Sequence, residues 1–396
     1  VFGVIRHLRL RQTFLKKNVG LVFGLNGELI MRYLGALILI NLLSGCAKEE
    51  PIQIDEDTVR DPQQLFEWKL VTSWPKNFPG LGTAPENFAR LVERMSAGRL
   101  KIKVFGAGQL VPAFEVFDAV SQGITEMGHG ASYYWTGKAE ETVFFTGVPF
   151  GLNAQEINGW LHYGGGLELW RELYEPFNLV PFAGGNTGVQ MAGWFNREIN
   201  SMEDIKGLKM RIPGLGGEVI TRAGGTSVTM PGNELYTSMQ TGVIDATEWV
   251  GPYNDLALGF HQVAKYYYYP GWHEPGSMLE FIVNSDAFEI LPDDLKAIVE
   301  VATRAVNQDM LDEYTAKNNQ ALAELIREHG VKLRKLPEPV LSEFRKLSKQ
   351  VLMEISTRND LSKRIAESVQ NFKEDAMTYH LISEEAYYQA RRASSD

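Results

Sequence analysis

Three charged side chains stand out in this sequence because each lies among aromatic or apolar residues. Arg211 ends the apolar run LKMR directly before Ile-Pro-Gly. Glu248 lies beside Trp249 in TEWVGPYND, and Glu274 lies in the aromatic stretch YYYYPGWHEPG. A guanidinium holds a carboxylate through two parallel hydrogen bonds, and carboxylates are hard oxygen ligands for Na⁺ or Ca²⁺. These residue types fit a site for an anion and a cation, and the two glutamates also fit a glycosidase-type acid–base pair.

Other catalytic signatures are absent from the sequence. It contains no HExxH, no GxSxG and no GxxxxGK followed by Ser or Thr. The glycine-rich stretches YGGG (163–166) and PGLGGEV (213–219) indicate turns, because neither completes a dinucleotide-binding fingerprint. Four of the seven histidines are considered as ligands but show no metal-ligand spacing, so we expect each to be a hydrogen-bonded structural residue: His129, His162, His261 and His273.

The composition favours a two-domain protein with a small-molecule partner. The chain has 396 residues, of which 44% are hydrophobic and 22% charged, as in an ordinary globular protein. Its formal net charge is −10, and outside the N-terminal stretch no cluster of Lys and Arg offers a phosphate-binding surface. Nucleic acid is therefore not an expected partner.

The pattern of residues 1–45 predicts an N-terminal extension followed by an export signal. Residues 31–46, MRYLGALILINLLSGC, have a basic start, a short apolar core and small residues before the only cysteine, Cys46. The apolar core is about half of the roughly 20 residues that a membrane span needs. We therefore predict a signal at 31–45, with Val1 and Met31 as alternative starts.

The ending LSGC resembles a bacterial lipobox, which makes Cys46 a predicted lipidation site. The alternative is a buried cysteine behind an uncleaved anchor. Residues 46–65 are acidic and poor in large apolar side chains, so we expect a flexible tether there.

From Trp68 onward, short apolar runs alternate with longer amphipathic ones. The patterns predict strands at 68–74 and 100–106 and helices at 85–98 and 111–123. Such a β-α-β-α series implies a parallel sheet that binds ligands at the carboxyl ends of its strands. We assign residues 66–187 to a first lobe and expect the segment MGHGASYYW at its ligand-facing edge.

The same alternation of short apolar and amphipathic runs, separated by Gly or Pro, recurs further along the chain. It predicts a second parallel α/β lobe at 188–275. Beyond it, 276–396 begins with an apolar return strand and then turns helical, with stretches expected at 291–330, 338–357 and 360–388. We expect this last part to be shared between the lobes.

Eight runs together carry a resemblance to a known family. They are VTSWPKNFPGLGT, GAGQLVPAFEVFDAV, EMGHGASYYW, FFTGVPFGL, NTGVQMAGWFN, IKGLKMRIPG, MQTGVIDATEWVGPYND and YYYYPGWHEP. Over about residues 66–390 the chain resembles the solute-binding subunits of TRAP transporters, above all the branch that binds 2-oxo acids. The resemblance implies an α/β, two-lobed periplasmic solute-binding protein fold (type II-like) with crossing hinge strands and long C-terminal helices.

The resemblance also implies roles for individual residues. Arg211 would grip the substrate carboxylate, and Tyr134 would donate a hydrogen bond to the substrate. A metal ion, Na⁺ or alternatively Ca²⁺, would be held at four positions: Gln190, Glu248, Trp249 through its backbone carbonyl, and Glu274. Asn186 and Asn233 are further candidates for ligand contact. A cation between the two glutamates and an anionic solute would also relieve their mutual repulsion.

Three functions follow as hypotheses. The first is a periplasmic receptor, not an enzyme, that passes a monocarboxylate such as pyruvate to TRAP permease subunits in the membrane. The second is an exported hydrolase that uses Glu248 and Glu274, and the third is a structural lipoprotein. Relatives form dimers, so the C-terminal helices serve either a homodimer or the monomer core. The identity of the acid, the choice of cation and lipidation at Cys46 stay open at this point.

Overall fold

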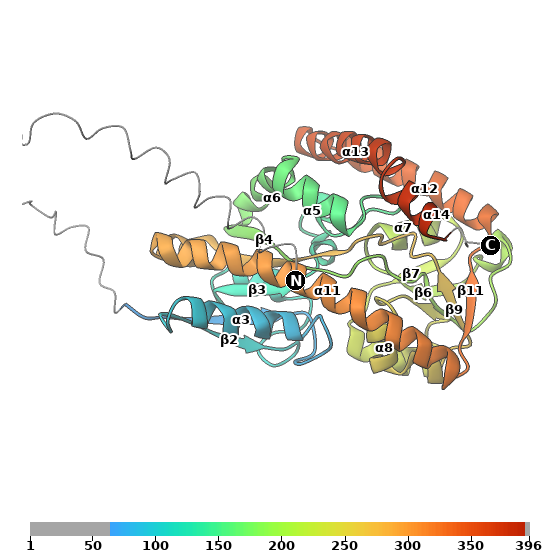
Figure 1. Ribbon diagram of the computed structural model, residues 1–396, viewed down its shortest axis with the longest axis horizontal. Helices are drawn as coiled ribbons and strands as arrows, with labels where there is room; N and C mark the ends of the chain where they lie inside the picture. The colour runs from blue at the N-terminus through green and yellow to red at the C-terminus, as the bar shows by residue number, and fades with distance from the viewer. Residues whose placement is uncertain (1–63, 393–396) are drawn as a thin grey trace, which may run out of the picture. The chain divides into compact units, whose positions relative to one another are not determined.

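The computed structural model describes residues 64–392, which form a mixed α/β fold with two sheets (Figure 1). The predicted signal at 31–45, Cys46 and nearly all of the expected tether at 46–65 lie outside the described residues. Within the described part, none of the helices combines the length and the hydropathy that a membrane span requires.

The first sheet has the strand order β2-β1-β3-β10-β4. Its strands are β1 (Phe66–Thr72), β2 (Leu100–Phe105), β3 (Met127–Gly130), β4 (Leu179–Asn186) and β10 (Met278–Asn284). β1 pairs in parallel with β2 and β3, which confirms the predicted β-α-β series. β10 runs antiparallel between β3 and β4, so the return strand completes this sheet.

Helices cover the first sheet where the sequence predicts crossovers. α3 (Thr83–Met95) follows β1 as expected and buries Phe88 and Val92. The helix expected at 111–123 is shorter, because a turn that ends at Glu115 precedes α4 (Val116–Ser121). The other helical segments of this part are η2 (Ser132–Trp135), η3 (Glu140–Phe145), α5 (Ala154–Tyr163), α6 (Gly166–Tyr174) and η4 (Glu175–Phe177).

The second sheet has the order β11-β9-β5-β8-β6-β7 and is mixed. Its strands are β5 (Gly193–Phe195), β6 (Lys209–Arg211), β7 (Thr226–Val228), β8 (Ala246–Thr247), β9 (Tyr266–Tyr269) and β11 (Lys332–Lys335). β6 is parallel to β7 and β8, but β5 is antiparallel to β8 and β9. The prediction of a purely parallel second lobe is therefore wrong at β5, because the chain enters this sheet from β4 without a helical crossover.

Short helices accompany the second sheet. They are η5 (Met202–Asp204), α7 (Gly214–Arg222), α8 (Gly232–Gln240), α9 (Pro252–Leu258) and η6 (Phe260–Gln262). The glycine-rich stretch 213–219 forms the start of α7, whose first residue is Gly214, so the prediction of a turn is wrong there.

Two extended segments carry the chain between the sheets. Residues 187–192 join β4 to β5, and residues 270–277 join β9 to β10. A bond from the Gln190 backbone N–H to the Glu274 carbonyl, 3.2 Å long, ties the two segments together. These crossings correspond to the expected hinge strands, and both carry candidate site residues.

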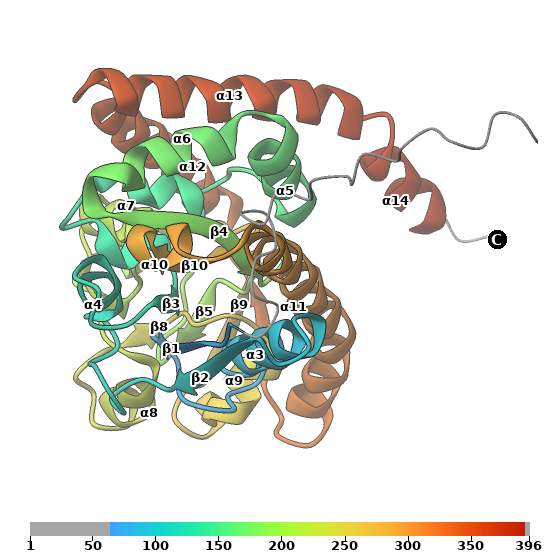
Figure 2. The same cartoon turned by 90° about the vertical axis from the view of Figure 1, so that its left-hand side faces the viewer.

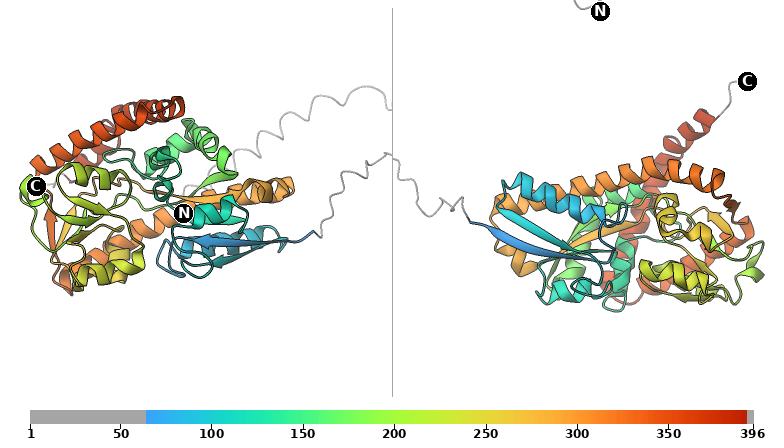
Figure 3. Two further views of the ribbon diagram at one scale, coloured as in Figure 1. Left: turned by 180° about the vertical axis from the view of Figure 1, so that it is seen from behind. Right: turned by 90° about the horizontal axis from the view of Figure 1, so that it is seen from below.

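The C-terminal helices lie across both sheet regions. After α10 (Ser285–Glu289), α11 (Asp293–Arg327) packs on β4, α3 and α9, and Figure 3 shows it passing the strands of both sheets. α12 (Glu338–Ser356) packs on α7, and α13 (Asp360–His380) on α5 and α6 (Figure 2). The helix expected at 360–388 is interrupted before α14 (Glu384–Arg392). The lobe boundaries 66–187, 188–275 and 276–396 stay predictions.

Candidate anion- and cation-binding site

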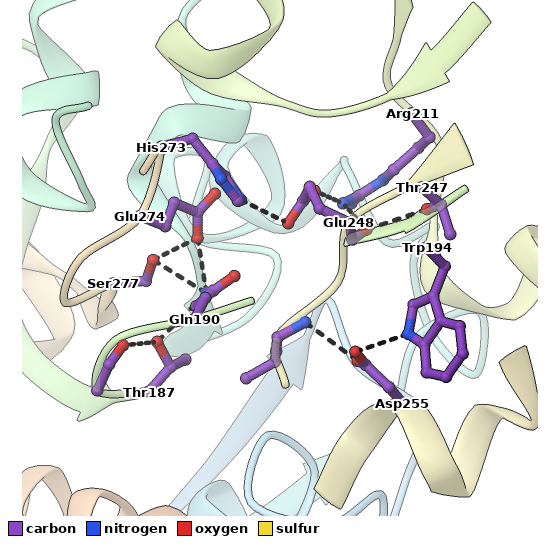
Figure 4. Close-up of polar contacts among 12 residues, drawn as sticks. Thr187, Gln190, Trp194, Arg211, Thr247, Glu248, Asp255, His273, Glu274 and Ser277 are labelled. Carbon is purple, nitrogen blue, oxygen red and sulfur yellow. Dashed lines mark hydrogen bonds and ion pairs between the residues drawn. The ribbon is translucent and has the colours of Figure 1, made fainter. Parts of the chain in front are cut away.

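Neighbouring strand ends and the two crossings bring the candidate residues together (Figure 4). Arg211 is the last residue of β6, and Glu248 directly follows its parallel neighbour β8. The carboxyl ends of such strands meet at one edge, and the Glu248 N–H donates to the Arg211 carbonyl over 3.2 Å. Gln190 comes from one crossing and Glu274 from the other.

Arg211 is a buried guanidinium with partners for four of its five N–H groups. Its side chain is 1% exposed, and Nη1 donates to the Glu248 carboxylate and, over 3.3 Å, to the Glu248 carbonyl. Nε donates to the Met230 carbonyl (3.2 Å) and Nη2 to the Tyr134 hydroxyl (3.3 Å). The guanidinium carbon also lies 5.1 Å from the centre of the Trp249 ring.

The charge of Arg211 is secured by these neighbours. Burial lowers the pKa of Arg211, but the facing Glu248 carboxylate and the Tyr134 hydroxyl raise it more, so the net shift is upward. A buried ion pair of this kind is costly to break, because one charge would then stay buried and unpaired. The site therefore keeps a fixed positive group that can face an anion.

The second half of the site is an acidic cluster. Glu248, His273 and Glu274 each offer one ligand atom, and these atoms lie within 4.8 Å of one another. Glu248 Oε2 lies 3.3 Å from His273 Nε2. Glu274 accepts hydrogen bonds from Gln190 Nε2 (2.7 Å) and from the Ser277 hydroxyl.

Burial and the nearby Glu248 carboxylate raise the pKa of Glu274 to about 7. Two carboxylates in a water-poor site repel each other, and a cation removes that repulsion. Gln190 Oε1 is buried and accepts no hydrogen bond from any residue within 64–392. A donor set of two carboxylates and an amide oxygen, with a histidine beside it, fits a hard cation such as Na⁺ or Ca²⁺.

The two halves border one narrow cavity of about 10 Å³. Its polar lining includes Tyr134, Gln190 and Arg211, and its apolar lining includes Trp74 and Trp249. A small space with a few convergent polar groups on aromatic walls is typical of a site for a small solute.

His129 has the structural role that the sequence predicts. It is fully buried, and burial lowers its pKa to about 4, so the ring is neutral at physiological pH. Its Nδ1 accepts the indole N–H of Trp74 (2.9 Å), and its Nε2 lies 3.0 Å from the Gly184 carbonyl. His129 thereby fixes the tryptophan that forms one wall of the cavity.

Most of the predicted site residues meet in this place. Arg211, Tyr134, Gln190 and Trp249 line the cavity, and Glu248 and Glu274 form the adjoining cluster. Their roles in binding stay predictions.

Asn186 and Asn233 are placed differently. Asn186 uses its amide on the backbone: Nδ2 donates to the Gly276 carbonyl (3.2 Å) and Oδ1 accepts from the Gly188 N–H (2.9 Å). It therefore braces the two crossings against each other. Asn233 is exposed on α8.

The structure adds three residues that the sequence interpretation did not assign to the site. His273, expected to be only structural, contacts Glu248, while Thr187 and Ser277 accept hydrogen bonds from Gln190 Nε2 over 3.2 and 3.1 Å. The adjacency of His273 to Glu274 was the only local signal. Thr187 lies in the run NTGVQMAGWFN but was given no role there, and Ser277 lies outside the eight runs.

Comparison with known proteins identifies the class. Residues 70–359 match the model of the family "Bacterial extracellular solute-binding protein, family 7", and the chain belongs to this family. A monocarboxylate 2-oxoacid-binding periplasmic protein of Nostoc sp. is 43% identical over 320 residues, which cover 81% of this chain and 87% of that protein.

Solved structures agree in sequence and fold. A TRAP periplasmic solute-binding protein from Pseudoalteromonas atlantica, with bound sodium and pyruvate, is 43% identical, with a TM-score of 0.80 over 82% of this chain and 99% of that one. One from Colwellia psychrerythraea, with bound calcium and pyruvate, is also 43% identical, with a TM-score of 0.81 over 83% and 100%. The two-lobed solute-binding fold expected from the sequence is thereby confirmed, and these relatives are binding proteins.

Proposed function

We propose that this chain is the extracytoplasmic receptor of a TRAP transporter, and that it binds a 2-oxo acid such as pyruvate together with a cation. The observation that carries the proposal is the position of Glu248. Its Oε1 pairs with Arg211, and its Oε2 faces His273 in the acidic cluster. One carboxylate thus joins an anion clamp to a cation site, as a receptor for an anion and a cation requires.

Arg211 would bind the substrate carboxylate. A guanidinium carries five N–H groups, and the bonds to Met230, Glu248 and Tyr134 account for four of them. The fifth, on Nη2, has no partner among residues 64–392 and is available to a carboxylate, and a second parallel bond requires Tyr134 or Glu248 to shift. Tyr134 stays neutral for this purpose, because burial raises the pKa of its hydroxyl.

The cation would be held by Gln190 Oε1, Glu248, Glu274 and the Trp249 carbonyl. When bound, Na⁺ or Ca²⁺ supplies positive charge to the substrate oxygens and to the two glutamates. The sodium and the calcium bound in the two similar structures support either ion. We take Na⁺ as the first candidate and Ca²⁺ as the alternative.

A hydrolase that uses Glu248 and Glu274 is not supported. Glu248 is buried in an ion pair with Arg211, so its carboxylate already has a partner and does not face a scissile bond alone. The relatives are solute-binding proteins, so we propose that no bond is made or broken in the bound solute.

The cellular setting belongs to the same proposal. We infer export to the periplasm, where the chain delivers its solute to TRAP permease subunits and is either lipid-anchored through Cys46 or free. A homodimer through α13 and α14 is supported by exposed apolar side chains there, among them Met377, Leu381, Ile382 and Tyr387.

Native mass spectrometry after incubation with pyruvate and Na⁺ or Ca²⁺ tests the proposal. We expect one pyruvate and one cation per chain, and pyruvate should be recovered unchanged after denaturation. Acetone, which has the oxo group without the carboxylate, is the control and should not bind. Conversion of pyruvate, or equal retention of acetone, would refute the proposed function.

A further inference from the structure

A buried carboxylate outside the cavity lining, Asp255, touches the backbone beside the proposed cation site. Asp255 lies in the first turn of α9 and is 1% exposed. Its Oδ2 accepts the indole N–H of Trp194 (2.9 Å) and the hydroxyl of Tyr267 (2.6 Å). Its Oδ1 accepts the backbone N–H of Val250 over 3.4 Å, and Figure 4 draws these contacts to Trp194 and to the backbone.

The bond to Val250 acts on the preceding residue. The Val250 N–H and the Trp249 C=O belong to one planar trans peptide unit, in which the two groups point in opposite directions. Holding the N–H therefore fixes the carbonyl on the side away from Asp255. The Val250 carbonyl accepts the Met191 N–H (3.1 Å), so the following peptide is held as well.

Asp255 is itself held rigidly. Trp194 and Tyr267 face each other on the paired strands β5 and β9, and their rings stack with centroids 4.1 Å apart. Both donate to the same oxygen, Oδ2, which leaves Oδ1 to the Val250 N–H. The Asp255 carboxylate, as the hydrogen-bond acceptor of this N–H, also polarises the peptide. This polarisation makes the Trp249 oxygen a stronger ligand.

From this geometry we infer that Asp255 is a positioning residue for the cation: it orients and polarises the Trp249 carbonyl through their shared peptide. The inference rests on the proposed function, since Trp249 is a cation ligand only within it. Asp255 itself does not touch the cation.

The first sheet contains a second buried carboxylate with the same kinds of hydrogen-bond donor as Asp255, and this residue serves as a control. Glu280 on β10 is fully buried and also accepts an indole N–H, from Trp135, and a tyrosine hydroxyl, from Tyr174 (2.9 Å). Within the part of the chain that the structure describes, it makes no hydrogen bond to the segment 248–251. Glu280→Gln therefore removes the same kind of buried charge without acting on the Trp249 carbonyl.

The test variant is Asp255→Asn. The amide oxygen can still accept from Trp194 and Tyr267, but its NH₂ then meets the Val250 N–H, donor against donor. The measured quantity is the Ca²⁺ concentration at which the pyruvate affinity rises halfway to its plateau, from calorimetric titrations in a Ca²⁺ series. Losing an outer-shell partner typically weakens metal affinity 10- to 100-fold.

We expect this midpoint to rise at least about 10-fold in Asp255→Asn and to stay within about twofold of wild type in Glu280→Gln. At saturating Ca²⁺ the pyruvate affinity of Asp255→Asn should return close to wild type. An unchanged midpoint in Asp255→Asn, or an equal rise in both variants, would overturn the inference. A wild type whose pyruvate affinity responds to neither Ca²⁺ nor Na⁺ would instead refute the cation site itself, and the inference with it.

A measurement on the wild-type chain covers the case in which Asp255→Asn does not fold. In ¹⁵N-valine-labelled protein, the amide resonance of Val250, assigned with Val250→Ile, should move with the same Ca²⁺ midpoint. A Val250 resonance that does not move at saturating Ca²⁺ and pyruvate would contradict a ligand role for its peptide.

Discussion

Replacing Arg211 by lysine tests the anion clamp while it keeps the buried charge. Alanine would leave Glu248 buried without its partner, which typically costs about 3–5 kcal/mol of stability and would confuse folding with binding. Lysine retains a cation for Glu248 but lacks the planar fork. The variant should therefore fold and still bind a carboxylate through at most one of the two parallel bonds.

The magnitude follows from the bonds that are lost. A charge-assisted hydrogen bond contributes about 1.5–3 kcal/mol, so the loss of one predicts a pyruvate Kd about 10- to 150-fold higher. The assay is isothermal calorimetry at saturating cation, with the melting temperature as a check of the fold.

Arg222→Lys is the matched control. Arg222 is also a doubly bonded arginine, with both Nη atoms 2.7 Å from the Glu354 carboxylate, but it joins α7 to α12 at the surface. Its variant should leave the pyruvate Kd within about twofold of wild type, because a surface ion pair contributes at most about 1 kcal/mol. A folded Arg211→Lys with wild-type affinity would refute the assignment of Arg211.

Three further predictions concern single side chains. Tyr134→Phe removes the proposed substrate donor and should raise the pyruvate Kd by about 3- to 10-fold, as one neutral hydrogen bond contributes roughly 0.5–1.5 kcal/mol; calorimetry with no change would contradict this. Glu274→Gln should weaken the Ca²⁺ effect on pyruvate binding about 10-fold or more, since one anionic ligand is lost, and an unchanged Ca²⁺ midpoint would argue against Glu274 as a ligand. Burial raises the pKa of Glu280 from 4.5 to about 7, so its contribution to stability is full below pH 4.5 and is lost as the pH rises through 7. Glu280→Gln should flatten the melting-temperature profile in that window, a difference of about 3 kcal/mol at most, and parallel profiles would exclude this role.

The hydrophobic periodicity of single segments predicted those strands and helices whose formation depends mainly on neighbouring residues in the sequence. β1, β2 and α3 have clear periodicities, and buried positions recur every three to four residues along much of α11. The direction of β5 could not be read in this way, because a three-residue strand is positioned by its long-range partners. Arg211 stood out at the end of an apolar strand, but by itself it favoured a surface or salt-bridged arginine, and its role came from the resemblance to the family.

The contacts within the site were less accessible to sequence reasoning. Gln190 and Glu274 are 84 residues apart and meet only because two crossings lie side by side. Asp255 and its partner Trp194 are separated by 61 residues, and Glu280 and Trp135 by 145. A buried carboxylate looks like a surface one in the sequence, since its burial depends on partners that the fold supplies.

The most direct test of the account is whether anion and cation binding depend on each other. Pyruvate is titrated calorimetrically into the wild-type chain in Na⁺ or Ca²⁺ buffer, and in a chelator-treated buffer whose only cation is a bulky organic one. A shared site predicts affinity that is about 5- to 150-fold higher with the inorganic cation, the usual range of coupling between two ligands. Equal affinity in both buffers, or no binding in either, would contradict the account.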